Sequence, residues 1–326
     1  MLLIVGYMAV ATLVVALSVK ASEYIDMLDS RTRLSGAFLG GVLLSAVTSL
    51  PELFTSVSAT LLLDEPSLCI GNILGSDLFN SAAFAAVGFL FVRHFSRAKL
   101  ASSNALVALF VVAIYAAMIL NWFNILNFEL ATVNILTIVI IVLYCVGVRY
   151  LAVGDSKPSD VDDAASEGSQ SADDDGLSVR TIVVRFVLVA IGIVTMSVVM
   201  TYLTDALDAE YNIGKGLAGA LFLGVATSLP ELSSTVALFR MRNYDVATGN
   251  IVGSNLFNFM ILCVVDVVSV GSRVYDYSDP KIENLLVYGL LSAIVMLPLI
   301  RTQNRFVRWA CMAVVVGCYF AFLLVE

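Results

Sequence analysis

Long apolar runs alternate with short polar stretches along the whole chain. A helix needs about 20 consecutive apolar residues to cross the hydrocarbon core of a membrane. The runs lack the strict alternation of apolar and polar residues that is typical of a membrane β-barrel. The pattern therefore predicts ten transmembrane helices, at approximately residues 2–19, 34–63, 67–92, 102–122, 130–150, 181–203, 213–239, 245–270, 284–301 and 307–325.

Composition agrees with a chain that has the bilayer as its solvent. Hydrophobic residues make up 60% of the sequence and charged residues only 13%, whereas a soluble domain carries about 25% charged residues. We therefore expect an all-α polytopic membrane protein, located in the cell membrane. The apolar run in residues 1–18 has no basic segment before it, so we interpret it as the first helix and not as a signal peptide.

One segment differs from the rest, the stretch "GDSKPSDVDDAASEGSQSADDDG" at residues 154–176. Its eight acidic residues and one lysine account for −7 of the formal net charge of −8. Segments of such low hydrophobicity and high charge are typically disordered. We expect residues 153–178 to form a solvated tether. A calcium-sensing role is the alternative, although the segment lacks the fixed glycine and terminal glutamate of an EF-hand loop.

Basic residues indicate the orientation. Of the 18 lysines and arginines, 15 lie in or beside the odd-numbered loops, and only Lys215, Arg273 and Lys281 belong to the even-numbered ones. Cytoplasmic loops carry the excess of Lys and Arg. The odd loops and the acidic linker are therefore predicted to be cytoplasmic, with both termini outside.

The chain contains an internal repeat. Thr48–Asn80 reads "TSLPELFTSVSATLLLDEPSLCIGNILGSDLFN", and Thr227–Asn258 reads "TSLPELSSTVALFRMRNYDVATGNIVGSNLFN". Equivalent positions are five predicted helices apart, an odd number, so the second copy enters the membrane upside down. Such inverted-topology repeats are typical of secondary transporters. We expect residues 1–152 and 179–326 to form two inverted five-helix repeats.

Each copy of "TSLPEL" places a proline and a glutamate inside an apolar run. Pro51 and Pro230 cannot donate a helix hydrogen bond, so one carbonyl in each run is left free. A carboxylate at membrane depth is costly, yet each copy also holds one. The oxygen-bearing side chains of the two motifs are Thr48, Ser49, Glu52, Thr227, Ser228 and Glu231. Oxygen ligands suit hard cations such as Ca²⁺ and Na⁺, and a bound cation explains both anomalies.

The following helix of each repeat carries a polar stripe, because its residues recur at every fourth position. The stripes are Asn72, Ser76 and Asn80, and Asn250, Ser254 and Asn258. In an apolar helix such a stripe faces protein or water. Close helix packing over the neighbouring glycines is the alternative explanation, but it does not account for Glu52 and Glu231. We infer one cation site between the two halves.

The elements "TSLPE" and "GNxxGSxxxN" resemble the α-repeats of the calcium/cation antiporter superfamily, the sodium/calcium exchangers in particular. The α-repeats would span residues 36–82 and 216–260, and the resemblance covers essentially the whole chain. It implies exchange of Ca²⁺ for Na⁺ or H⁺ by alternating access, with Glu52 and Glu231 as central ligands. It also implies side-chain ligands at Thr48, Ser49, Ser76, Thr227, Ser228 and Ser254, and carbonyl ligands near Ser45 and Gly224.

Three positions depart from that pattern or add to it. Some family members carry an aspartate where this chain has Asn258, whereas Asn80 and Asn258 are both amides here. The matched site then holds two carboxylates and not three. Asp77 stands where the second repeat has Asn255 and points away from the stripe, so we expect it to have a structural partner. Asp266 is expected at the outer mouth of the eighth helix.

The leading hypothesis is a Ca²⁺ antiporter driven by Na⁺. An H⁺-driven antiporter, a carrier of another divalent cation, and a cation channel remain alternatives. Two carboxylates balance one Ca²⁺, two Na⁺ or two H⁺, whereas a third Na⁺ would leave an unpaired charge in an apolar medium. A potassium-dependent mode is disfavoured by the two amides. We expect Ca²⁺ and Na⁺ to be transported ions, and we expect no organic cofactor and no nucleic-acid partner. A monomer would be adequate.

Enzyme chemistry is disfavoured. His94, the single histidine, lies in a basic loop, and the sequence contains no HExxH motif and no pairing of a nucleophile with a histidine. The cysteines have no metal-ligand spacing, and we expect them to be small core residues: Cys69, Cys145, Cys263, Cys311 and Cys318.

Overall fold

The computed structural model describes residues 2–32, 48–126, 128–130, 133–154, 178–269, 274–275, 277 and 279–325. Helices dominate these residues, as predicted. In the first half they are α1 (Leu2–Thr32), α4 (Leu50–Leu61), α5 (Pro66–Leu90), α6 (Val92–Phe95), α7 (Ser102–Trp122) and α8 (Ile135–Gly154). In the second half they are α9 (Val179–Tyr211), α10 (Lys215–Ala218), the π-helix η2 (Gly219–Gly224), α11 (Val225–Thr227), α12 (Leu229–Arg240), α13 (Tyr244–Val268), α14 (Pro280–Arg301) and α15 (Arg305–Leu324).

Each of the ten predicted apolar runs contains helix. Within the described part of the chain, seven helices are long and apolar enough to cross a membrane, or eight if the bent segment 215–240 counts as one span. The two remaining runs contain α4, whose run begins outside the described residues, and α8, whose apolar part Ile135–Arg149 is shorter. The chain is a multi-pass membrane protein with the predicted all-α architecture.

The start of the fifth predicted helix needs a correction. The apolar run begins at residue 130, but α8 begins only at Ile135. The strands β1 (Glu129–Leu130) and β2 (Val133–Asn134) precede it and pair antiparallel. Asn134 decides where the helix begins, because its Oδ1 accepts a hydrogen bond from the backbone N–H of Leu136 at 2.9 Å. A side-chain acceptor of this kind satisfies a free donor of the first helical turn.

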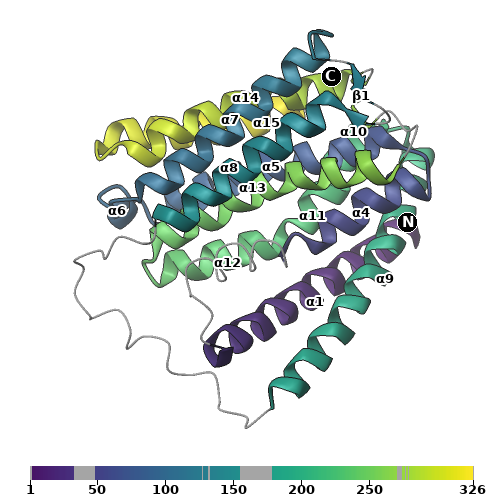
Figure 1. Ribbon diagram of the computed structural model, residues 1–326, viewed down its shortest axis with the longest axis horizontal. Helices are drawn as coiled ribbons and strands as arrows, with labels where there is room; N and C mark the ends of the chain where they lie inside the picture. The colour runs from purple at the N-terminus through teal and green to yellow at the C-terminus, as the bar shows by residue number, and fades with distance from the viewer. Residues whose placement is uncertain are drawn as a thin grey trace.

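Two helices form the centre of the bundle. In their most apolar windows α5 is 78% buried and α13 is 67% buried, whereas α1 and α9 are only 22% and 17% buried. The central helices are the ones that carry the polar stripes. α1 and α9, the first helices of the two repeats, pack against each other and lie at an angle beside the remaining helices (Figure 1). This arrangement is the one expected when equivalent helices of two inverted repeats meet.

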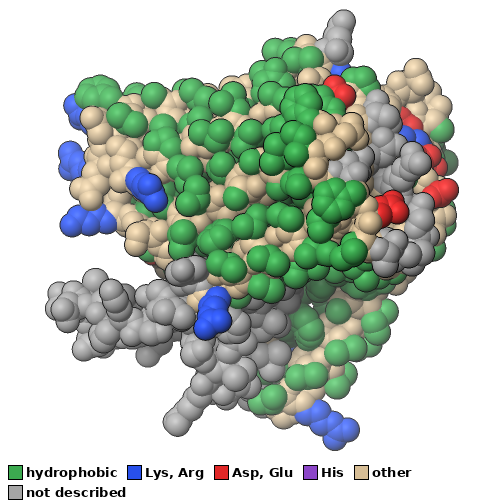
Figure 2. Space-filling view, turned by 45° about the horizontal axis from the view of Figure 1, so that its top comes forward, with side chains coloured by type: hydrophobic (Ala, Val, Ile, Leu, Met, Phe, Trp, Pro, Cys, Tyr) green, Lys and Arg blue, Asp and Glu red, His purple; other side chains and the backbone are tan. Residues whose placement is uncertain are grey.

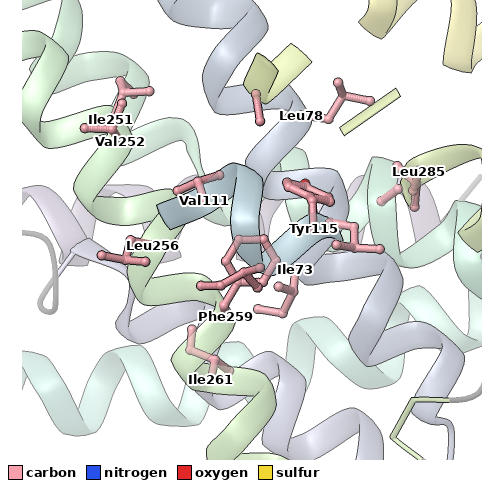
Figure 3. Packing of buried hydrophobic residues seen from close by; sticks show 14 of the residues in the cluster. Ile73, Leu78, Val111, Tyr115, Ile251, Val252, Leu256, Phe259, Ile261 and Leu285 are labelled. Carbon is pink, nitrogen blue, oxygen red and sulfur yellow. The ribbon is translucent and has the colours of Figure 1, made fainter. Parts of the chain in front are cut away.

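The apolar core joins the central helices to α7 and α14. Tyr115 of α7 packs edge-on against Phe259 of α13, with ring centroids 5.1 Å apart, and Ile73 of α5 lies beside this pair (Figure 3). All five cysteines are free, and Cys145 is exposed while the other four are buried. The expectation of core cysteines is therefore confirmed for four and wrong for Cys145, which lies on the outer surface of α8.

Charge is segregated along the long axis of the molecule. In Figure 2, a group of Lys and Arg side chains without acidic neighbours lies at one end, the Asp and Glu side chains lie at the other end together with a few basic ones, and a hydrophobic band lies between. The basic end is the end that carries α6, and the two chain termini lie toward the opposite end (Figure 1). Such a belt between two charged ends is what a bilayer requires of a protein that spans it.

Candidate cation site

A break in the helix carries each copy of the "TSLPEL" motif. The helical segments Lys215–Thr227 and Leu229–Arg240 are bent by 45° at the residue between them, Ser228. Ser228 and its counterpart Ser49 share the same non-helical backbone, with φ of −88° and ψ of 3° and 11°. In each repeat a proline occupies the first turn of the helix that follows. The break predicted from the proline is confirmed in the second repeat. In the first repeat Ser49 has the same backbone conformation, and the segment before Thr48 lies outside the described residues.

The two glutamates lie one turn beyond the breaks, in the first turns of α4 and α12. Both side chains are completely buried. Ser228 donates a hydrogen bond to Glu52 Oε1 at 3.2 Å, and Ser49 donates one to Glu231 Oε1 at 3.4 Å. Each carboxylate is thus held by the serine of the opposite repeat, and the two motifs together form one site. A helix N-terminus also favours a negative charge in its first turn.

The motif threonines belong to the same cross-repeat arrangement. Thr48 and Thr227 are buried, and Thr48 lies beside Glu231 while Thr227 lies beside Glu52. The Thr227 hydroxyl donates to the carbonyl of Leu223 at 2.9 Å. Ser45, which was expected to supply a carbonyl, lies outside the described residues.

Asn72 holds the first glutamate-bearing helix in place. Its Nδ2 donates to Thr55 Oγ1 at 2.9 Å, to Ser56 Oγ at 2.8 Å, and to the carbonyl of Glu52 at 3.3 Å. Asn250, the matching stripe residue, donates from its Nδ2 to a serine of α12 at 3.3 Å. These hydrogen bonds use only the amide nitrogens of Asn72 and Asn250, so their amide oxygens remain available to bind another group.

The sequence reasoning missed the hydroxyls that receive these amides, Thr55 and Ser234. Both hydroxyls donate back to the carbonyls of their own helix, for example Thr55 to Pro51 at 2.8 Å and Ser234 to Pro230 at 3.1 Å. A signal for them exists, because a hydroxyl recurs three residues after the glutamate in both copies.

Ser76 joins the two repeats, because its hydroxyl donates to the carbonyl of Gly224 at 3.2 Å. The predicted serine and the predicted carbonyl are thus brought together. Glycines permit this approach: a Cβ added at Gly75 would lie 2.4 Å from the Cα of Ala220, and one added at Gly224 would lie 2.8 Å from the backbone nitrogen of Ser76. The glycine-lined crossing of α5 and η2 therefore brings the stripe up to the break.

The last stripe residues are held by a different set of contacts. Asn80 donates from Nδ2 to Asn255 Oδ1 at 3.1 Å, and Asn258 donates from Nδ2 to Asp77 Oδ1 at 2.9 Å. Asp77 has the structural partner that was expected of it. Neither of these bonds involves Glu52 or Glu231. Asn80 and Asn258 are related to the two carboxylates only because they lie on the same polar stripes as Ser76 and Ser254.

Asp266 is not at an open mouth. Its side chain is buried, and its Oδ2 accepts hydrogen bonds from the Thr137 hydroxyl at 2.7 Å and from the backbone N–H of Asn134 at 3.1 Å. The expectation of a mouth residue is wrong, because β2 and the first turn of α8 pack against this end of α13 and supply one donor each.

Several buried oxygen atoms of the site have no hydrogen-bond partner among the residues that the structure describes. They are Oε2 of Glu52 and Glu231, Oδ1 of Asn72, Asn80, Asn250 and Asn258, and Oγ of Ser254. Buried polar atoms are normally satisfied, and six of these atoms carry only lone pairs. A set of carboxylate, amide and hydroxyl oxygens is the chemistry that a hard cation such as Ca²⁺ or Na⁺ takes from a protein.

Among the described residues, no positive side chain forms an ion pair with either glutamate. The ion pairs found within the described ranges involve only Lys20 and Lys215, and neither pairs with Glu52 or Glu231. In the same ranges no three or more His, Cys, Asp or Glu side chains lie together in an arrangement that could hold a metal ion. Two carboxylates surrounded by neutral oxygens fit a transported hard cation.

Comparison with known proteins identifies relatives over both halves. A family model described as "Sodium/calcium exchanger protein" matches residues 2–153 and 181–326. The inner membrane protein YrbG of Escherichia coli (strain K12) is 26% identical over 224 residues, which cover 69% of this chain and 66% of that protein. The two regions that the family model matches leave out the acidic linker.

Two solved structures share the fold. A crystal structure of the H⁺/Ca²⁺ exchanger CAX matches with a TM-score of 0.73 at 11% identity, covering 99% of this chain and 82% of that chain. A structure of the sodium-calcium exchanger NCX_Mj, soaked with Na⁺ and Sr²⁺, matches with a TM-score of 0.59 at 17% identity and covers 100% of this chain and 99% of that one. At these identities the similarity concerns the architecture alone.

Proposed function

The chain belongs to the sodium/calcium exchanger family, and on this premise we propose that it is a secondary antiporter that exchanges Ca²⁺ for Na⁺ across a membrane. The observation that carries the proposal is the pair of fully buried carboxylates, Glu52 and Glu231. Each has one oxygen without a hydrogen-bond partner in the described part of the chain. A buried charge must be paired, and a transported cation is the partner that the site chemistry favours.

The charge of the two carboxylates limits which ions can be exchanged at the site. Two carboxylates are neutralised by one Ca²⁺, by two Na⁺ or by two H⁺, whereas a larger positive charge in the same place would be penalised by the apolar surroundings. The hydroxyls at the two breaks suit Na⁺ as well as Ca²⁺, because both ions prefer oxygen ligands. Competition for the same carboxylates is the property that couples the movement of one ion to the other.

The cross-repeat bonds suggest how the site changes access. Glu52 is held by Ser228, and Glu231 is held by Ser49, so any displacement of one repeat against the other changes both contacts together. Inverted repeats of this kind can present one central site to either side of the membrane. The basic end of the molecule (Figure 2) supports a cytoplasmic location for that end.

Exchange of Ca²⁺ for H⁺ is the second candidate. The observation that favours it is the pair of amides, Asn80 and Asn258, which leaves the site with two carboxylates and no third charge near them from the stripes. Two protons would neutralise Glu52 and Glu231 as fully as two sodium ions would.

Uptake of radiolabelled Ca²⁺ into proteoliposomes separates these candidates, with Na⁺ and pH gradients imposed one at a time. We expect uptake when Na⁺ is loaded inside the vesicles and little uptake with a pH gradient alone. Full uptake driven by the pH gradient without Na⁺ would contradict the sodium proposal and leave Glu52 and Glu231 as proton carriers.

The same vesicles test the distinction from a channel. An antiporter moves Ca²⁺ only when a counter-cation is present on the opposite side, whereas a channel needs no counter-cation. Ca²⁺ flux that persists with neither gradient and follows the membrane potential would overturn the antiporter proposal. The charge carried per Ca²⁺ then reports the stoichiometry: no current means two Na⁺, and net positive charge moving in the direction of Na⁺ means three or more.

A further inference from the structure

A third buried carboxylate lies near the candidate cation site, and the function proposed above does not use it. Asp77 of α5 is only 2% exposed and occupies the position at which the second repeat has Asn255. Among the described residues no Lys, Arg or His forms an ion pair with it. A buried carboxylate without a countercharge is costly. The presence of an aspartate in the first repeat where the second has an asparagine therefore requires an explanation.

The known partners of Asp77 are neutral, and one of its oxygens is poorly satisfied. Oδ1 accepts a hydrogen bond from Asn258 Nδ2 at 2.9 Å. Oδ2 has the Tyr115 hydroxyl at 3.5 Å, which is at the outer limit of hydrogen-bonding distance. Oδ2 is therefore the atom with free capacity to bind another group.

A small cavity lies beside the Asp77 side chain. Its volume is about 10 Å³, and Asp77, Ser81, Tyr115 and Asn255 line it together with small and apolar residues of α7, α13 and α14. A volume of this size is about the minimum that holds one water molecule. The cavity opens on the side of α5 that faces Tyr115 of α7 and Gly289 of α14, next to the core shown in Figure 3.

The amide of Asn255 is held in one orientation by three bonds. Its Nδ2 donates to the carbonyl of Asp77 and to Ser81 Oγ, both at 3.2 Å, while its Oδ1 accepts from Asn80 at 3.1 Å. The polar atoms lining the cavity are thus a carboxylate, two hydroxyls and an amide whose nitrogen is already used. The atoms left to bind a ligand are therefore oxygens. Oxygen atoms bind alkali cations and do not bind anions.

We propose that Asp77, Ser81, Tyr115 and Asn255 form a binding site for one monovalent cation of the size of Na⁺. One carboxylate balances one positive charge, whereas a divalent ion would leave an uncompensated charge in the core. The cavity has room for a single small ion, so Na⁺ is preferred over K⁺. The site is separate from the glutamate pair, since none of its four residues hydrogen-bonds to Glu52 or Glu231.

Asn258 is the link between the two sites. Because its amide nitrogen is bound to Asp77, its Oδ1 has to face away from Asp77, and that oxygen has no partner within the described residues. A cation on Asp77 therefore positions a candidate ligand of the central site. The proposal does not require the glutamate pair to bind Ca²⁺, and the test is designed to keep the two apart.

The test removes the central site first. In the Glu52→Gln/Glu231→Gln protein, thermal unfolding is measured in Na⁺, in K⁺ and in N-methylglucamine at constant ionic strength. A ligand that binds the native state raises its apparent stability. We expect Na⁺ to raise the unfolding midpoint by roughly 2–4 °C, K⁺ to raise it less, and Asp77→Asn in the same background to abolish the rise.

A matched control uses the same substitution at a satisfied carboxylate. Asp266→Asn changes a buried aspartate whose Oδ2 already has two close donors, so the Na⁺-dependent rise should remain. Tyr115→Phe removes one neutral oxygen and should weaken the Na⁺ dependence without abolishing it. If the double glutamine protein does not fold, the same comparison is made between wild type and Asp77→Asn at saturating Ca²⁺, where the central site is filled.

Two outcomes would overturn the proposal. No difference between Na⁺ and N-methylglucamine in the double glutamine protein would mean that the cavity holds water or that Asp77 carries a proton. A Na⁺-dependent rise that survives Asp77→Asn would place the ion elsewhere. Failure of Ca²⁺ exchange in proteoliposomes would contradict the function proposed above and would leave this result unaffected.

Discussion

At the scale of single residues, the site is held together by hydrogen bonds between the two repeats. Glu52 and Glu231 are equivalent in the two repeats, yet each takes its serine donor from the other repeat. Neither has a cationic neighbour among the described residues. The cost of burying them falls on the protein until a cation binds, so the carboxylates serve ion binding at the expense of stability.

Glu52→Gln and Glu231→Gln should each abolish exchange and leave the protein folded. The loss of one charged ligand from a buried pair costs about 3 kcal/mol, or about 100-fold in Ca²⁺ affinity. Glutamine has nearly the same shape, and removing the charge relieves desolvation. The measurement is the shift of the thermal unfolding midpoint with added Ca²⁺.

Glu23→Gln is the control for these two variants, because Glu23 is paired with Lys20 in an exposed ion pair on α1. Its Ca²⁺-dependent shift should equal that of wild type. If both site variants kept the shift together with transport, the assignment of the carboxylates as ion ligands would be wrong.

At the scale of elements, broken helices and close helix crossings determine where the site residues lie. The bend at Ser228 leaves the carbonyl of Ala226 without its usual helical donor, because the fourth residue after it is Pro230. The glycines of α5 and η2 let two backbones meet without side chains between them. The helix break and the close crossing are both backbone features. Each can be tested by a substitution, which adds a Cβ in place of glycine or a backbone N–H in place of proline.

Pro230→Ala should lower the apparent Ca²⁺ affinity while leaving stability in the absence of Ca²⁺ unchanged or higher. Alanine supplies the missing N–H and can straighten the segment, because it permits the helical hydrogen bond to the carbonyl of Ala226 that Pro230 cannot make. Ca²⁺-dependent thermal shift measures the affinity. Pro298→Ala in α14 is the control and should leave the Ca²⁺ affinity at the wild-type value. Wild-type affinity in Pro230→Ala as well would show that the break is not needed for binding.

Gly75→Ala should destabilise the fold. The new Cβ would lie 2.4 Å from the Cα of Ala220, and a backbone atom cannot give way as a side chain can. Overpacking of this kind costs about 1–3 kcal/mol, which thermal unfolding in detergent will register as a lower midpoint. Gly317→Ala in α15 meets nothing within 4 Å and should be neutral or stabilising; a matching fall there would remove the argument from close approach.

At the scale of the whole molecule, the two repeats meet along their central helices. α5 packs against η2 and α13, and α4 packs against α5 and α13, so the site lies on the boundary between the halves. The basic and acidic ends (Figure 2) give the bundle a direction along the membrane normal. Both the orientation and the role of the linker are properties at this scale.

Reporter fusions test the orientation. A phosphatase that is active only outside the cytoplasm should be active at the C-terminus, and a fluorescent protein that matures in the cytoplasm should fluoresce within residues 155–177. The physical reason is the excess of Lys and Arg in the odd loops. The reverse pattern of activities would mean that the bundle is inserted the other way up.

Replacing Ser156–Asp175 by an uncharged flexible linker should leave the Ca²⁺ dependence of transport unchanged within a few-fold. The segment falls outside both regions that match the family, residues 2–153 and 181–326, and its composition favours a solvated tether. Transport at graded Ca²⁺ concentrations measures the effect. A replacement of the same length that keeps the acidic residues is the control. A large change in apparent affinity confined to the uncharged linker would favour the calcium-sensing alternative.

Much of the fold and part of the site follow from the sequence for local reasons. A run of apolar residues must be helical in a bilayer, because its backbone groups have no other partners. Pro51 and Pro230 must break their helices because they carry no N–H. An odd number of helices between the repeats makes the second copy inverted. The glutamates at these breaks could therefore be proposed as ligands without any structure.

Only the tertiary structure decides which faces meet. Residue spacing shows that Asn72 and Ser76 share a face, but not that Ser76 reaches the carbonyl of Gly224. It likewise does not show that Ser49 reaches Glu231 across the two repeats. Periodicity is a property of one helix, whereas these contacts depend on the crossing of two, and that crossing is set by glycine contacts between residues far apart in the chain. The same reason hid the cavity beside Asp77, which exists only where four helices pack together.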